Sequence, residues 1–216
     1  MPMAEELPPS LLASLGEGPA RVLVSGNNLG SHGLRTLDLL PAQAVRMALD
    51  HLAAAGHRRL LVFNVQPRDA IIGTRIDEAQ VWARSHPEVT VTIAGEAVAS
   101  GEKTLPAARI QARQLLHEQH PTAVLALTLP AAQGMIRVAV DSGLPPGRAF
   151  AVATIDGEGI AEELVPSITS VDLDPVDLSH LLAEAVTWMR GADWPGTKAH
   201  ACQPVLHVRE STDGVR

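Results

Sequence analysis

Short apolar segments rich in β-branched residues alternate along this chain with longer amphipathic segments. The first pattern is typical of strands, and apolar residues at three- and four-residue spacing are typical of helices. The predicted strands are Arg21–Ser25, Leu60–Val65, Thr90–Ala94, Ala123–Thr128, Ala149–Ile155, Val205–Val208 and a weaker one, Ser167–Val171. The predicted helices are Pro8–Leu15, Pro41–Ala55, Ala70–Arg84, Pro106–His117, Ala131–Ser142 and Val176–Arg190.

This alternation predicts an α/β fold in which parallel sheets are covered by helices on both faces. Gly56, Gly143 and Gly191 stand where three of the helices are expected to end, because glycine commonly follows the last helical turn. The chain has 216 residues, of which 46% are hydrophobic, so it is long and apolar enough to bury a core.

The carboxyl ends of the predicted strands indicate where a ligand would bind, since open parallel sheets bind ligands beyond these ends. The residues found there are Gln66 and Arg68 after the second strand, Thr128 at the end of the fourth, Asp156 after the fifth, and Arg75 in the first turns of the helix that begins near Ala70. A guanidinium donates from a planar fork and a carboxylate accepts from paired hydroxyls, so Arg75 and Asp156 suit a polyhydroxyl ligand. A salt bridge between the two without any ligand is the alternative.

Composition excludes several other functions. The net charge is −7 and the arginines are scattered, which argues against DNA binding by this polypeptide. We expect no membrane segment, because no apolar run reaches about 18 residues. The single cysteine, Cys202, and the absence of a secretory leader at the start of the sequence favour a cytoplasmic protein.

Catalytic and metal-binding patterns are also missing. The cluster His117–His120 lacks the spacing that places two imidazoles one helical turn apart, so we expect no metal site. There is no Gly-x-Ser-x-Gly motif and no obvious acid–base pair. The sequence therefore predicts neither an enzyme nor a cofactor-binding protein.

Four segments resemble, in order and spacing, the effector-binding domain of the lactose-repressor/galactose-repressor (LacI/GalR) family of transcriptional regulators. They are MALDHLAAAGHRRLLVF, GTRIDEAQ, PTAVLALTLPAAQGMIRVAVDSGL and AFAVATIDGEG, and the similarity spans roughly Arg21 to Thr212. The resemblance implies a periplasmic-binding-protein-like fold and a sugar-like effector. Arg75 falls on an arginine that contacts the effector in the family, and Asp156 falls on the first aspartate of a motif that binds it.

Three departures from the family pattern are visible. The Asn-Asp pair that follows a strand in the family is Thr128-Leu129 here, and the second aspartate of the later motif is Gly157. The aromatic residue that many members present near the Ala97–Gly101 loop is absent. These changes imply a pocket that is less polar and less aromatic than that of a typical sugar sensor.

The resemblance also implies a division into lobes. Residues 1–57 correspond to part of the amino lobe, 58–169 to the carboxy lobe, 170–190 to the return into the amino lobe, and 191–216 to the final carboxy-lobe strand and tail. We expect a homodimer that reaches operator DNA only through a helix-turn-helix that this sequence lacks. A stand-alone solute-binding protein, or an interaction protein that dimerises with full-length relatives, is the alternative. We expect Arg75→Ala and Asp156→Ala each to abolish effector binding while leaving the fold intact.

Overall fold

The computed structural model of this protein describes residues 9–17, 23–25, 35–98, 104–147, 150–157, 159–173, 175–191, 193 and 199–213. Residues 8, 21–22 and 149, at the starts of three predicted elements, and residues 99–101 of the Ala97–Gly101 loop lie outside the described residues. The chain forms two compact units. Unit 1 comprises Met1–Pro41, Asp69–Ile71 and Leu173–Pro204, and unit 2 comprises Ala42–Arg68, Ile72–Asp172 and Val205–Arg216.

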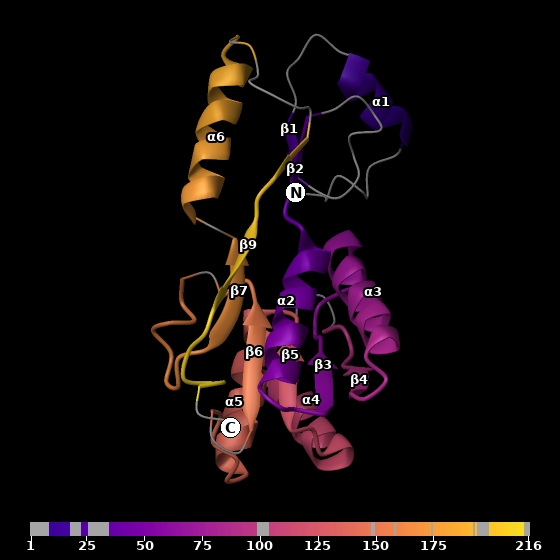
Figure 1. The fold of residues 1–216 in the computed structure, drawn as a ribbon. Helices are drawn as coiled ribbons and strands as arrows, with labels where there is room; N and C mark the ends of the chain where they lie inside the picture. The colour runs from indigo at the N-terminus through magenta and orange to yellow at the C-terminus, as the bar shows by residue number, and fades with distance from the viewer. Residues whose placement is uncertain are drawn as a thin grey trace. The chain divides into compact units, whose positions relative to one another are not determined.

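Unit 2 is built around a six-stranded sheet of order β4-β3-β5-β6-β7-β9 (Figure 1). The strands are β3 (Arg59–Phe63), β4 (Thr90–Ala94), β5 (Ala123–Ala126), β6 (Ala151–Ile155), β7 (Thr169–Leu173) and β9 (Pro204–His207). Neighbouring strands from β4 to β7 pair in parallel. The predicted α/β fold with a parallel sheet is therefore confirmed, and all six strands had been predicted from their apolar patterns.

Helices cover both faces of this sheet because its strands are apolar on both sides. Side chains of β3 alternate, with Leu60 and Val62 in one buried cluster and Leu61 and Phe63 in the other. Helices α2 (Pro41–Ala54) and α3 (Ala70–Ser85) supply the first cluster. Helices α4 (Thr104–Gln119) and α5 (Leu129–Asp141) supply the second, where the close α4–α5 contact leaves no room for a side chain at Gly134.

Unit 1 contains a three-stranded parallel sheet of order β1-β2-β8, together with helices α1 and α6. The elements are α1 (Pro9–Glu17), β1 (Leu23–Ser25), β2 (Arg35–Asp38), α6 (Pro175–Met189) and β8 (Ala199–Ala201). The sequence pattern did not predict β2 or β8. Both are short and carry polar residues such as Asp38 and His200, so they are strands because of pairing across the sheet rather than because of local propensity.

The turn glycines that end three helices behave as predicted. Gly56, Gly143 and Gly191 follow α2, α5 and α6 with φ angles of +98°, +73° and +111°. These angles lie in the region that L side chains rarely adopt, which explains why glycine is found there.

A seam of buried hydroxyl groups joins the carboxy-terminal segment to the sheet. The Ser211 hydroxyl donates to the Val152 carbonyl at 2.6 Å and accepts from the Thr169 amide at 2.8 Å. The hydroxyls of Thr169 and Thr212 lie 2.6 Å apart, and Thr212 Oγ1 is 2.9 Å from His51 Nε2 in α2. Residues 211–212 are therefore held inside unit 2 by polar contacts that are shielded from water.

The imidazoles of His51 and His57 are expected to make the stability of unit 2 depend on pH. Burial lowers the pKa of both below 6.5, and for His57 the positive charges of His51 and Arg58 lower the pKa further. The folded protein then binds fewer protons than the unfolded chain, so the free energy of unfolding is highest above pH 6.5 and decreases as the pH falls through the lowered values.

The melting temperature measured between about pH 7.5 and pH 5 checks this sign. Among the described residues His57 Nε2 has no hydrogen-bond partner, so His57→Leu removes a titrating group without breaking a side-chain bond. The variant should lose less stability over this range than the wild type. An equal loss in both proteins would show that His57 does not carry the effect.

Candidate functional site

Arg75 connects the carboxyl ends of two neighbouring strands. It lies in the second turn of α3, and its side chain is only 7% exposed. Its Nη1 donates to the Leu127 carbonyl just after β5 at 2.7 Å, and its Nη2 forms an ion pair with the Asp156 carboxylate just after β6. The structure thus brings together Arg75 and Asp156, two of the residues predicted at the carboxyl ends of the strands.

Asp156 faces water on one side. Its side chain is 43% exposed, so one face of the carboxylate remains open to a ligand while the other contacts Arg75. The backbone has φ of +57°, a left-handed conformation that aspartate tolerates better than most residues. The Asp156 amide donates to the Val171 carbonyl of β7 at 3.1 Å, which fixes the start of this turn.

Thr128 directly follows Leu127, the residue whose carbonyl accepts from Arg75. It is the N-cap of α5, but its side chain makes no capping bond. Among the described residues, Thr128 Oγ1 and Arg75 Nε are buried and have no hydrogen-bond partner. Buried polar atoms without partners are rare because each costs free energy, so these two atoms are candidates for contact with a bound molecule.

Gln66 is placed by a residue that the sequence reasoning did not single out. The buried Asn64 side chain donates from Nδ2 to the Gln66 carbonyl at 2.7 Å and accepts from the Gln66 amide at 3.1 Å. These two hydrogen bonds to the backbone of Gln66 shape the turn that follows β3. An asparagine between Phe63 and Val65 in a buried apolar run was the available signal.

Arg68 is engaged elsewhere. Its Nη2 contacts Asp77 of α3 at 2.6 Å, and both side chains are about 60% exposed. Exposed pairs of this kind contribute little to stability. Among the described contacts, none joins Arg68 to Arg75 or Asp156, so a part for Arg68 in ligand binding remains a prediction.

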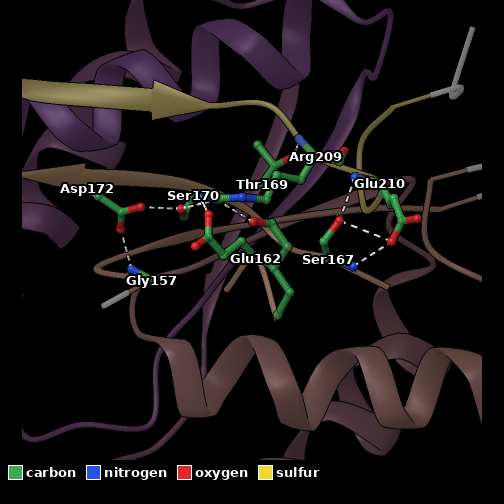
Figure 2. Close-up of polar contacts among 9 residues, drawn as sticks. Gly157, Glu162, Ser167, Thr169, Ser170, Asp172, Arg209 and Glu210 are labelled. Atoms are coloured by element: carbon green, nitrogen blue, oxygen red, sulfur yellow. Dashed lines mark hydrogen bonds and ion pairs between the residues drawn. The ribbon is translucent and has the colours of Figure 1, made fainter. Parts of the chain in front are cut away.

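The sequence patterns also did not indicate a second carboxylate near the site, that of Asp172. Asp172 in β7 accepts the Gly157 amide in the turn that carries Asp156, and it accepts the Ser170 hydroxyl at 2.5 Å (Figure 2). An acidic residue at the end of a strand with alternating polarity could equally have been a solvated side chain, so the sequence offered no signal for this contact.

The polar groups that converge at this rim can bind a neutral ligand with several hydroxyls. Arg75 offers donors, the exposed face of Asp156 offers acceptors, and Thr128 can do either. Over the part of the chain that the structure describes, no group of three or more His, Cys, Asp or Glu residues is arranged to hold a metal ion. Within the same residues, no helix is long and apolar enough to cross a membrane.

Comparison with known proteins identifies the domain. A family model described as a periplasmic binding protein-like domain matches residues 49–212. The chain belongs to this family. The comparison with curated proteins finds no match.

Solved structures of this fold include several transcriptional regulators. The Escherichia coli transcriptional repressor ascG has a TM-score of 0.81 at 17% identity, over 98% of this chain and 77% of that chain. A LacI family transcriptional regulator from Arthrobacter sp. FB24, in complex with lactose, has a TM-score of 0.71 at 20% identity, over 88% and 71%. A LacI family transcriptional regulator from Enterococcus faecium with bound ribose has 0.68 at 14%, over 90% and 71%. The resemblance inferred from the sequence motifs is thereby confirmed for the domain family and the fold.

Proposed function

We propose that this chain is the small-molecule sensing domain of a LacI/GalR-type transcriptional regulator and that its effector is a sugar or a similar polyhydroxyl metabolite. The observation that carries this proposal is the Arg75–Asp156 pair at the carboxyl ends of β5 and β6. Two structural relatives contain lactose and ribose, which supports the same class of ligand here.

The expected binding mode follows from the geometry of these side chains. Hydroxyls of the ligand would donate to the exposed face of the Asp156 carboxylate, and contact with the buried Arg75 Nε and Thr128 Oγ1 would require these side chains to move. Both Phe63 and Phe150 are fully buried and the chain has no tyrosine, so we expect neither phenylalanine nor tyrosine to stack on the sugar. We therefore expect modest affinity that depends strongly on hydrogen bonds.

Our proposal extends to assembly and location. We propose a cytoplasmic homodimer without enzymatic activity, whose contact with operator DNA requires a helix-turn-helix. The net charge of −7 is consistent with a chain that does not bind DNA by itself.

The test is a thermal-melt and calorimetric titration with lactose, D-ribose and D-xylulose. A sugar that binds only the folded state stabilises it by about 2.7 kcal/mol at a hundredfold excess over Kd. At least one of these sugars should raise the melting temperature of the wild type and leave that of Asp156→Asn unchanged. Asparagine keeps the left-handed backbone at this position but removes the charge.

Asp141→Asn is the matched control, because among the described residues Asp141 forms only an exposed pair with Arg137 within α5. This variant should respond to sugar as the wild type does. Equal responses in wild type and Asp156→Asn would remove Asp156 from the site. Absence of any response in the wild type would reject a sugar of this class as effector. Sedimentation velocity on the same samples tests the homodimer.

A further inference from the structure

The turn that carries Asp156 is held by two successive backbone amides. The Asp156 amide donates to the Val171 carbonyl at 3.1 Å, and the Gly157 amide donates to the Asp172 carboxylate. Both acceptors belong to β7, the strand that pairs with β6. The position of the Asp156 carboxylate therefore depends on a neighbouring strand as well as on Arg75.

Asp172 is itself fixed by a chain of hydrogen bonds. Its second carboxylate oxygen accepts from the Ser170 hydroxyl at 2.5 Å, and that hydroxyl accepts from Arg209 Nη1 at 2.7 Å. Arg209 Nη1 also donates to the Ile168 carbonyl at 2.9 Å. Arg209 Nη2 lies 3.9 Å from Glu162 Oε2. Figure 2 shows this series running from Arg209 through Ser170 to Asp172 and then to Gly157. Charge-assisted bonds of this kind are stronger than neutral ones and orient their partners well.

The absence of a side chain at Gly157 is required by the same contacts. A Cβ atom at this position would lie 2.7 Å from Ala161 Cβ, 2.8 Å from Ser170 Oγ and 2.9 Å from Ser170 Cβ. The family motif has its second aspartate at this place. In this chain a side chain there would displace Ser170, and the Gly157 amide donates to the Asp172 carboxylate.

We propose that Asp172 is a positioning residue for the candidate effector site. By holding the Gly157 amide it fixes the turn in which Asp156 is left-handed, and so it keeps the Asp156 carboxylate directed towards Arg75 and the ligand. This inference rests on the proposed function for its effect on affinity. Asp172 is also the last residue of this segment of unit 2, and Leu173 belongs to unit 1.

The test compares Asp172→Ala and Asp172→Asn with the wild type and with the control Asp141→Asn. Hydrogen exchange of the Gly157 amide, measured by NMR without sugar, reports whether the turn is held. Asp172→Ala should raise the Gly157 exchange rate about tenfold or more, whereas Asp172→Asn, which keeps a carbonyl acceptor, should remain close to wild type. Titration with lactose, D-ribose and D-xylulose then measures the affinity of each variant.

Affinity should decrease in the order wild type, Asp172→Asn, Asp172→Ala, with a loss of about tenfold for alanine, the scale seen when a residue that orients a ligand-binding group is removed. A purely structural role would lower the melting temperature of Asp172→Ala and leave its affinity unchanged, which would overturn the proposal. Unchanged Gly157 exchange in Asp172→Ala would overturn it as well. If none of the three sugars binds the wild type, the proposed effector class fails, while Gly157 exchange still decides whether Asp172 holds the turn.

Discussion

Asp156→Ala should lower the free energy of unfolding by about 3 kcal/mol and abolish sugar binding. The Arg75 guanidinium is almost completely buried, with a side-chain exposure of 7%, and it would keep its charge in a site without a counter-ion. Alanine is also poorly suited to the φ of +57° at this position, which adds a penalty of about 1 kcal/mol. Urea denaturation followed by circular dichroism measures the total.

Asp156→Gly and Asp156→Asn separate these two causes. Glycine removes the carboxylate but accepts the left-handed backbone, so it should be more stable than alanine by about 1 kcal/mol. Asparagine accepts this backbone and keeps an acceptor for Arg75, so it should be the most stable of the three. Equal stability of the alanine and glycine variants would show that the backbone conformation contributes nothing.

Arg75→Met provides the complementary measurement. It leaves the Asp156 carboxylate unpaired, but this group is 43% exposed and water can solvate it. The loss of stability should therefore be smaller than for Asp156→Ala, although both variants lose ligand binding. A larger loss in Arg75→Met would mean that the bond to the Leu127 carbonyl, rather than charge compensation, dominates.

Gly95→Ala should destabilise unit 2 by about 3 kcal/mol or more. Gly95 follows β4 with φ of +112°, and a Cβ atom there would lie 1.9 Å from the Asn64 carbonyl oxygen. The obstacle is backbone rather than a flexible side chain, so the end of β3 would have to move. Asn64 holds both backbone polar groups of Gln66, and the turn after β3 would move with it.

Gly143→Ala is the matched control for backbone conformation alone. Gly143 has φ of +73°, but nothing lies within 4 Å of an added Cβ. Its substitution should cost only about 1 kcal/mol. The difference between the two variants in urea denaturation measures the steric contact at Asn64, and equal losses would show that the contact relaxes without cost.

The sequence by itself determined the elements of unit 2 and the edge of the sheet where the site lies. The alternating apolar residues of β3 and the helical spacing in α2 and α3 are local patterns that predict the correct elements, because these apolar side chains are the ones buried in the folded unit. The same periodicity places Arg75 near the start of α3 and Asp156 at the end of β6. Local patterns left the pairing of Arg75 with Asp156 as one of two alternatives, and they did not indicate the contacts of Asn64 or Asp172.

Only the tertiary structure decided which polar residues face one another. Both Arg75 and Arg68 were predicted at the edge of the sheet, yet Arg75 is buried against Asp156 whereas Arg68 pairs with Asp77 at the surface. Asp172 reaches Gly157 from a different strand, and β2 and β8 are strands through pairing with each other. Contacts of this kind join residues distant in the chain, and their free energy depends on burial and geometry that only the folded chain creates.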